Sequence, residues 1–362
     1  MFNHRWMGYI VKKIPLLLIL CIPSVFTCGQ QQRVSDLEFP FIDAGSDSAR
    51  TCQSFQNVDG VDGLYMLRYY GDYGKRLEKQ NQTVLNGFNS QPSRRECSLF
   101  TALGDSARPL YGRNFDNPEC GVLIGLYRPS DGYASIAFSR LNDFGFDKVI
   151  DPDTLTAQDR ARILYAPFFS AGGMNARGVV TALAYLEGVQ TVPDAEQRPV
   201  FVTLWIREIL DHASNIDEAV AICKRCRVFD AGPDICSHHI LICDASGRSV
   251  IVEYHEGLWR IMPNVQPWQV VTNSPLFGRS QEERQKRCRR YKKAFETLEE
   301  KEGKITQQEG MSLLKALSVG GERSGTQWSS LFDIAERNIL LSLYRNYKNL
   351  YRVSLPTSSL KN

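Results

Sequence analysis

The feature that most constrains this chain is a pair of short segments that the residue pattern predicts to form one β-hairpin. Residues 98–102 are largely apolar, residues 110–115 resume a strand pattern, and a Gly-Asp-Ser turn lies between them. Cys97 stands at the start of the first segment, and Arg113 and Asp116 stand at the end of the second. Opposed strands of a hairpin bring their side chains together. The hairpin therefore places a possible nucleophile, a cation and a carboxylate near one another.

Composition limits the class of protein that carries this hairpin. The chain has 362 residues, of which 43% are hydrophobic, so it is long enough to bury a full core. Its formal net charge of +3 gives no reason to expect a nucleic-acid partner. We therefore expect a globular protein without a nucleic-acid partner.

The N-terminus has the pattern of a secretory signal. Basic residues precede an apolar run at 14–26, which is short for a membrane span. Residues 1–29 are therefore expected to be a signal peptide, and the protein is expected to be exported to a secreted, periplasmic or membrane-anchored location. Cleavage after Gly29 and membrane attachment through a lipidated Cys28 are both open.

The rest of the chain divides into three parts by composition. Residues 30–60 are polar and show no helical or strand period, so we expect a linker. Residues 61–96 contain a strand pattern and a polar helix and precede Cys97. Residues 97–362 form one continuous α+β domain. The chain has ten cysteines, and their spacing leaves any disulfide pairing open.

The pattern after Cys97 predicts strands interrupted by helices. Asn215, followed three residues later by Glu218, forms a capping pair at the start of one helix. Strands are expected at 98–103, 110–115, 122–127, 133–138, 178–185, 238–243, 249–254, 258–262, 269–272, 329–333 and 350–354. Helices are expected at 202–212, 215–224, 280–300 and 307–317.

Four groups of residues carry a resemblance to a known family. They are Cys97, Gly-Arg-Asn-Phe-Asp at 112–116, Gly-Met-Asn-Ala-Arg-Gly at 173–178 and Val-Thr-Asn-Ser-Pro at 271–275. In this order and spacing the chain resembles the linear amide hydrolases of the choloylglycine hydrolase and penicillin V acylase family. The resemblance implies an N-terminal nucleophile hydrolase, in which a cut frees the catalytic Cys as a new N-terminus. Residues 61–96 are then expected to be a propeptide or small-subunit segment. It also implies an α+β fold, a four-layer αββα sandwich of two antiparallel sheets flanked by helices.

The resemblance assigns roles to individual residues. Cys97 is the nucleophile, Arg113 lies beside its thiol and Asp116 lies near its α-amine, while Asn273 is the side-chain donor to the oxyanion. Tyr185 occupies the position that is Asn in many bile-salt hydrolases and Tyr in penicillin V acylases. The late arginine of the family is best matched by Arg290, with Arg287 and Arg289 as alternatives in the same basic run.

The chemistry of amide cleavage needs these residue types. An amide carbonyl is a poor electrophile, so the enzyme needs an activated nucleophile, a proton carrier and donors for the oxyanion. A free thiol has a pKa of about 8.5 and a free α-amine one of about 7.7 to 8.0, so an N-terminal Cys supplies nucleophile and base together. A guanidinium favours the thiolate, and a carboxylate stabilises an ammonium. Cys97 fills both roles only if the Glu96–Cys97 bond is cut.

Taken singly, each residue also has a structural interpretation. A Cys in an apolar strand is usually a small core residue, and Arg113 with Asp116 is alone typical of a surface ion pair. Asn175 is expected to be a turn residue. Cys223 and Cys226 have the spacing of a metal or redox pair but lack a second cluster. We therefore expect neither metal nor cofactor.

The sequence predicts an exported, self-processing amidase that cleaves a linear, non-peptide amide of a small N-acyl compound through a Cys97 thioester. An acyltransferase that uses the same thioester is an alternative. A non-catalytic exported binding protein that keeps the fold is a second one, motivated by the long segment before Cys97. The substrate and the oligomeric state stay open.

Overall fold

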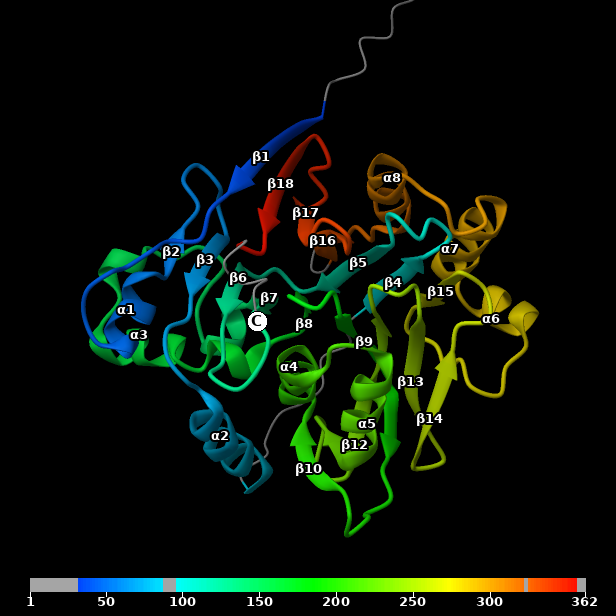
Figure 1. The fold of residues 1–362 in the computed structure, drawn as a ribbon, viewed down its shortest axis with the longest axis horizontal. Coiled ribbons are helices and arrows are strands. Elements are labelled where there is room, and N and C mark those ends of the chain that lie inside the picture. The colour runs from blue at the N-terminus through cyan, green and yellow to red at the C-terminus, as the bar shows by residue number, and fades with distance from the viewer. Residues whose placement is uncertain (1–31, 87–95, 322–324, 357–362) are drawn as a thin grey trace, which may run out of the picture. The chain divides into compact units, whose positions relative to one another are not determined.

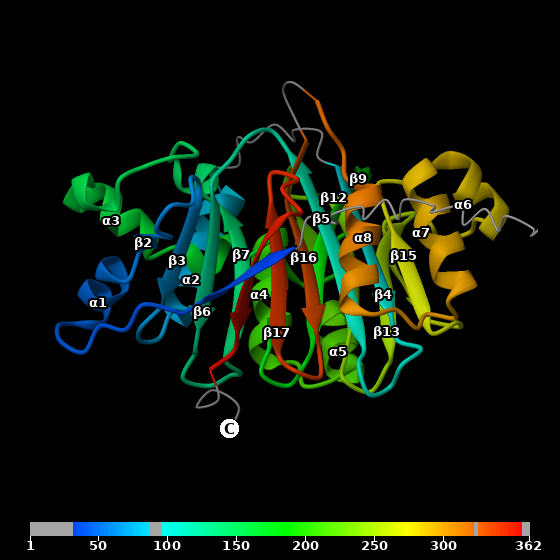
Figure 2. The same cartoon turned by 90° about the horizontal axis from the view of Figure 1, so that it is seen from above.

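Two β-sheets lie face to face, and helices cover the outer side of each (Figures 1 and 2). The coordinates are a computed structural model, and the residues it describes are 32–86, 96–321 and 325–356. The expected signal segment at 1–29, including Cys28, lies outside these ranges. No helix within them is long and apolar enough to cross a membrane.

The first sheet of the described chain has seven strands and contains the predicted hairpin. Its strand order is β1 (Arg33–Leu37), β18 (Asn349–Ser354), β17 (Asn338–Leu343), β16 (Gly325–Asp333), β5 (Leu110–Asn117), β4 (Glu96–Ala102) and β15 (Trp268–Val271). Only β1 pairs in a parallel sense, with β18, and the other pairs are antiparallel. The hairpin thus lies near one end of this sheet, beside the edge strand β15.

The second sheet has nine strands in the same described ranges. Its order is β14 (Leu258–Pro263), β13 (Ser249–His255), β12 (Ile235–Cys243), β9 (Val180–Gln190), β8 (Gly172–Asn175), β7 (Ser135–Arg140), β6 (Val122–Tyr127), β3 (Leu64–Arg68) and β2 (Gln56–Asn57). A separate parallel pair joins β10 (Arg198–Phe201) to β11 (Cys226–Phe229). The β12 to β13 hairpin turns at residues 244–247, as predicted, where Gly247 has a positive φ of 82°.

Helices form the two outer layers. On the seven-stranded sheet lie α7 (Arg289–Glu300) and α8 (Gln307–Leu317), and on the nine-stranded sheet lie α4 (Val202–His212) and α5 (Ile216–Arg225). Figure 1 shows these layers from α8 at the top to α4 and α5 below. The remaining helices are α1 (Asp47–Gln53), α2 (Gly74–Asn86), α3 (Ala157–Ile163) and α6 (Gln281–Arg287). The expected four-layer α+β sandwich is therefore confirmed, but both sheets are mixed rather than antiparallel, because β1 pairs with β18 and β3 with β6 in parallel.

Hydrophobic burial holds the layers together. One cluster fills the space between the sheets and continues beneath α7 and α8, with the fully buried Trp328 among its members. A second cluster lies between the nine-stranded sheet and α4, where Trp205 and Ile209 are fully buried. Helix α5 begins at Asn215, whose side chain accepts from the backbone N–H of Glu218, so the predicted capping pair is confirmed.

The expected linker at 30–60 is instead structured in its described part. It contains β1, α1 and β2. Strand β1 is largely exposed and is held by backbone pairing to β18, so it shows no apolar alternation. Helix α1 begins at the N-cap Ser46. Backbone pairing and a polar cap leave no apolar pattern in the sequence, so the composition of residues 30–60 wrongly indicated a linker.

The single helix expected at 280–300 is two helices. Cys288 has an extended backbone (φ −141°, ψ 113°), which ends α6 and starts α7. The thiol of Cys288 accepts from the backbone N–H of Tyr291 and caps α7. Cysteine is a weak N-cap signal, so the sequence did not reveal this break. The break places Arg290 in the first turn of α7.

Candidate active site

Cys97 lies on β4, buried between the sheets with 2% of its surface exposed. In the β4–β5 register Cys97 faces Phe115, and Arg113 faces Leu99. Cys97 and Arg113 are therefore diagonal neighbours on one face of the hairpin rather than directly opposed. The thiol contacts the guanidinium of Arg113 and the backbone N–H of Asp116. Burial raises the pKa of the Cys97 thiol, and the charge of Arg113 acts against that rise.

Arg113 extends from β5 across the space between the sheets. Its side chain is 1% exposed and donates to two backbone carbonyls of the opposite sheet, Ala171 (3.0 Å) and Leu183 (3.2 Å). The guanidinium carbon lies 4.9 Å from the ring centre of Phe115 and 5.7 Å from that of Trp328. These contacts fix a full positive charge beside the thiol.

Gly172 makes room for this arginine. A Cβ atom at position 172 would lie 2.7 Å from Nη1 of Arg113 and 2.6 Å from the Cβ of Ala182. Glycine is therefore required for the close approach of the guanidinium to β8.

Asp116 is the second buried charge of β5, and its side chain is 3% exposed. Oδ1 accepts from the hydroxyl of Thr326 (2.5 Å), and Oδ2 lies 3.4 Å from Nη1 of Arg290. Burial raises the pKa of Asp116 to about 7, although the hydroxyl of Thr326 and the charge of Arg290 lower it. A carboxyl with this pKa changes its protonation near neutral pH.

Asn273 follows β15 and joins the nucleophile to the second sheet. Its Oδ1 accepts from the backbone N–H of Cys97 (2.9 Å), and its Nδ2 donates to the carbonyl of Tyr185 (2.8 Å). An amide nitrogen carries two hydrogens, so the bond to Tyr185 uses one of them and orients the group. Tyr185 reaches the site through this backbone carbonyl, and its ring lies edge-on to His238.

Arg290 is the arginine of the basic run that lies in the site. Its side chain is 18% exposed and comes from the first turn of α7. Nη1 and Nη2 donate to five groups: the Cys97 carbonyl (2.7 Å), Ser98 Oγ (2.8 Å), Asp116 Oδ2 (3.4 Å), Glu96 Oε2 (2.9 Å) and Asn273 Oδ1 (3.0 Å). One guanidinium thus contacts residues on both sides of the Glu96–Cys97 bond.

The structure brings together five of the six site residues predicted from the sequence, Cys97, Arg113, Asp116, Asn273 and Arg290, by their side chains. The sixth, Tyr185, enters through its main chain. Asn175 is fully buried, and its Oδ1 accepts from the backbone N–H groups of Arg177 and Val179. It is therefore a turn residue, as expected.

Sequence reasoning missed two buried acid–histidine pairs beside the site. His239 on β12 contacts Glu253 on β13 and the carbonyl of Thr272, next to Asn273. His238 contacts Asp230 and packs against Tyr185. Adjacent histidines at 238 and 239 within an apolar strand were the one available signal, but the partners are distant in sequence.

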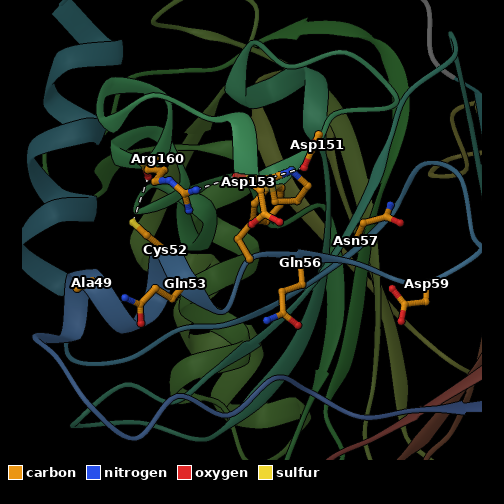
Figure 3. A pocket seen from close by; sticks show the side chains of 11 residues that line it. Ala49, Cys52, Gln53, Gln56, Asn57, Asp59, Asp151, Asp153 and Arg160 are labelled. Atoms are coloured by element: carbon orange, nitrogen blue, oxygen red, sulfur yellow. Dashed lines mark hydrogen bonds between the residues drawn. The ribbon is translucent and has the colours of Figure 1, made fainter.

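A separate cleft lies at the other end of the nine-stranded sheet (Figure 3). Its volume is about 730 Å³, and its lining comes from α1, the β2 segment and residues near α3. Cys52 donates to the carbonyl of Arg160 (3.3 Å) in its wall. None of the six predicted site residues lines this cleft, so it is distinct from the candidate active site.

Other cysteines of the chain also have structural surroundings. Cys52, Cys97, Cys223, Cys226, Cys236, Cys243 and Cys288 are free thiols. Cys223 is fully buried on α5, and the thiol of Cys226 contacts Glu208. Within the same ranges no three His, Cys, Asp or Glu side chains are grouped to hold a metal ion.

Comparison with known proteins agrees with this geometry. Residues 161–308 match the model of the family "Linear amide C-N hydrolases, choloylglycine hydrolase family". That range contains Tyr185, Asn273 and Arg290, whereas Cys97 precedes it. A penicillin V acylase from Pectobacterium atrosepticum is 28% identical over 114 residues, which cover 29% of this chain and 30% of that protein. The chain therefore matches less than a third of the length of this relative.

Solved structures share the fold. A mutant of the conjugated bile acid hydrolase from Clostridium perfringens aligns with a TM-score of 0.54 at 15% identity, covering 72% of this chain and 92% of that one. Penicillin V acylase from Agrobacterium tumefaciens aligns with a TM-score of 0.50 at 18% identity, covering 73% and 88%. The family match and the shared fold together confirm that this chain resembles the choloylglycine hydrolase and penicillin V acylase family of linear amide hydrolases.

Proposed function

We propose that this protein is an exported hydrolase of linear, non-peptide amides whose nucleophile is Cys97, freed by cleavage of the Glu96–Cys97 bond. The observation that carries the proposal is the set of groups gathered around Cys97: its thiol contacts the guanidinium of Arg113, and its main chain contacts the side chains of Arg290 and Asn273. Arg290 contacts Cys97, Asp116 and Asn273 at once. A structural role for each residue alone does not require this convergence.

The proposed activation step is an acyl shift followed by hydrolysis. The Cys97 sulfur attacks the carbonyl carbon of Glu96, the C–N bond breaks, and the Cys97 nitrogen takes the proton and becomes a free amine. Water then hydrolyses the thioester and leaves a carboxylate on Glu96 and a thiol on Cys97. Arg290, which contacts Glu96 and the Cys97 carbonyl, holds the bond in place during this step.

The proposed catalytic cycle uses the same atoms. The α-amine of Cys97 takes the thiol proton and the thiolate attacks the amide carbonyl, while Arg113 stabilises the thiolate. The Nδ2 group of Asn273 donates to the oxyanion. The amine leaves with the proton, and water hydrolyses the thioester to release the acid. If another amine takes the acyl group in place of water, the product is a new amide.

The segment before Cys97 stays bound after cleavage in this proposal. Four of the five residues of β3 are buried, and β3 pairs in parallel with β6 inside the nine-stranded sheet. Removal of β3 would expose the paired edge of β6. We therefore propose a two-chain mature enzyme rather than loss of the segment.

The substrate class follows from the relatives only in outline. The relatives named above are acylases of penicillin V and a hydrolase of conjugated bile acids. We propose a small N-acyl amide as the substrate. Export is proposed from the apolar run at 14–26, with signal cleavage or lipid attachment at Cys28 to be separated by the mass of the mature N-terminus.

The first experiment is intact mass and N-terminal sequencing of the wild-type protein beside a Cys97→Ala variant prepared in the same way. We expect two wild-type chains that copurify, one of which begins at Cys97, and one uncut chain in the variant. Penicillin V and a glycine-conjugated bile acid are then tested as probes. An uncut wild type that hydrolyses neither probe would support the binding-protein alternative.

A further inference from the structure

The pair His239 and Glu253 connects the nine-stranded sheet to the segment that carries Asn273. The two residues lie one position beyond the cross-strand pair Ile240–Val252 of β12 and β13. Both are buried, with 0% and 1% of their side chains exposed. Thr272, the residue that His239 also contacts, follows β15 of the seven-stranded sheet. The contact therefore bridges the two sheets beside the candidate site.

Hydrogen-bond partners define the protonation state of this pair. His239 Nε2 lies 2.7 Å from the carbonyl oxygen of Thr272, which only accepts, so Nε2 carries a proton. His239 Nδ1 lies 2.9 Å from Oε2 of Glu253. The same carboxyl accepts from the backbone N–H groups of Leu276 (3.0 and 3.1 Å) and Phe277 (3.1 Å). The carboxylate form accepts from both N–H groups and from Nδ1 at once, and in that form Nδ1 carries a proton as well.

The electrostatics of Glu253 agree with this assignment. Burial alone would raise the pKa of Glu253, but the hydrogen bond and charge of His239 and the two backbone N–H groups lower it below its ordinary value. The pair is thus an imidazolium and a carboxylate, both removed from water. Buried ion pairs of this kind contribute little net stability but fix geometry when every polar atom has a partner.

We propose that His239, paired with Glu253, is a positioning residue that fixes the segment at 272–277 and thereby aims the amide of Asn273. The inference rests on the proposed function, because Asn273 matters as a donor only if an oxyanion forms. His239 holds the carbonyl immediately before Asn273, and Glu253 holds the N–H groups three and four residues after it. The side chain of Asn273 is tied to the carbonyl of Tyr185 on β9, the strand next to β12. Contacts with the nine-stranded sheet therefore position both the main chain around Asn273 and its side chain.

Two substitutions separate positioning from simple stability. In His239→Gln the amide nitrogen takes the place of Nε2, so donation to Thr272 is kept. In His239→Asn the amide nitrogen takes the place of Nδ1, so donation to Glu253 is kept and the hold on Thr272 is lost. Asp211→Asn, which breaks the buried Arg207–Asp211 pair on α4, is the control for loss of a buried ion pair elsewhere.

We expect His239→Asn to lower kcat about a hundredfold on whichever amide probe the wild type hydrolyses, with KM changed less than about threefold, because a displaced donor acts on the transition state. His239→Gln should lose less than about tenfold. Asp211→Asn should keep the wild-type kcat. Equal kcat losses in the two His239 variants, or an equal loss in Asp211→Asn, would overturn the inference.

Two measurements do not depend on turnover and decide the inference even if the wild type hydrolyses neither probe. Nitrogen NMR of the wild type, assigned with His239→Gln, should show both ring nitrogens of His239 protonated at pH 7. Hydrogen exchange should be faster at 272–277 in His239→Asn than in His239→Gln. A ring nitrogen of His239 without a proton, or unchanged exchange at 272–277, would contradict the proposal, whereas an inactive wild type contradicts only the proposed function.

Discussion

The two sheets contribute to the candidate site in different ways. The seven-stranded sheet supplies reactive side chains, with Cys97 on β4 and Arg113 and Asp116 on β5. The nine-stranded sheet supplies backbone carbonyls that orient them, from Leu183 to Arg113 and from Tyr185 to Asn273. A carbonyl is present whatever the side chain, so the orienting half of the site places little demand on residue type. The reactive half depends on each side chain.

The largest expected effect comes from breaking the contact between the sheets at Arg113. Arg113→Lys keeps a charge but not the planar fork that donates to two carbonyls. Without the two carbonyl contacts the lysine ammonium is not held against the thiol. A close cation changes a thiol pKa by roughly 1 to 3 units, so we expect turnover to fall by about a thousandfold when it is displaced. Two buried carbonyls also lose a charged donor, although that of Ala171 keeps the backbone N–H of Leu183. We expect this loss to cost about 2 to 3 kcal/mol in the free energy of unfolding. Turnover and chemical denaturation measure the two effects.

Arg207→Lys is the matched control for this prediction. Arg207 is also fully buried, but it lies on α4 and pairs with Asp211 on the outer side of the nine-stranded sheet. It should lose stability and keep turnover. If Arg113→Lys and Arg207→Lys lost turnover to a similar extent, the loss would come from breaking any buried arginine contact and not from the position of Arg113 beside the thiol.

Asn273 contacts both sheets, through Cys97 on β4 and Tyr185 on β9, so its substitution tests the contact between them. Asn273→Asp keeps an oxygen toward the N–H of Cys97 and removes the donor nitrogen. Loss of a donor to an oxyanion costs about 2.7 to 4 kcal/mol in the barrier, so turnover should fall by about a hundredfold or more. Asn273→Ala should lose a similar amount. Steady-state kinetics of both variants check this prediction. A turnover of Asn273→Asp near that of the wild type would argue against the donor role.

The reactive half of the site was predictable because its residues lie close together in the sequence. Cys97, Arg113 and Asp116 belong to one hairpin, whose turn and strand patterns were plain. Asn273 and Arg290 were identified through the family resemblance. The resemblance already favoured Arg290 over Arg287 and Arg289, and the contacts of Arg290 in the structure agree with that choice.

The orienting half was not predictable for a physical reason. The contacts of Ala171 and Leu183 use main-chain atoms, which leave no residue signature. His239 on β12 and Glu253 on β13 are separated in sequence from the segment at 272–277 by at least β14 and β15, and they contact it only when the sheets pack. Strand β1 was missed likewise, because pairing with β18 rather than burial holds it.

Gly172 offers a smaller perturbation of the orienting half. In Gly172→Ala the new Cβ meets the Cβ of Ala182 at 2.6 Å, Nη1 of Arg113 at 2.7 Å and the backbone oxygen of Thr181 at 2.9 Å, so the guanidinium and the neighbouring strand must both shift. We expect turnover to fall by about tenfold. This is less than the loss of about a hundredfold that a displacement of a full ångström causes. Gly232→Ala is the control, because its Cβ meets the side chain of Ile235 at an ordinary 3.5 Å. Equal kinetics of the two variants would show that Arg113 tolerates the shift.

The smallest expected effect is on the pH dependence of stability, and we test it at Asp116 on β5 of the seven-stranded sheet. Burial raises the pKa of Asp116 to about 7 from its ordinary 3.8. The protonated form is therefore favoured by folding, and the stability it gives is complete below about pH 4 and lost as the pH rises through about 7. Asn cannot ionise, so Asp116→Asn removes the loss of stability that ionisation of Asp116 causes as the pH rises.

The comparison is made in a Cys97→Ala background, so that the chain stays uncut and no α-amine forms beside the carboxyl. Melting temperatures are measured at pH 5 and pH 8 with and without Asp116→Asn, and Asp131→Asn, an exposed site, serves as the control. Relative to its parent, the Asp116→Asn protein should gain a few degrees between pH 5 and pH 8, and Asp131→Asn should not. A constant difference would mean that Asp116 stays ionised across this range. In the cut wild type a free ammonium would lower the same pKa, so a weaker pH dependence there would place the new N-terminus beside Asp116.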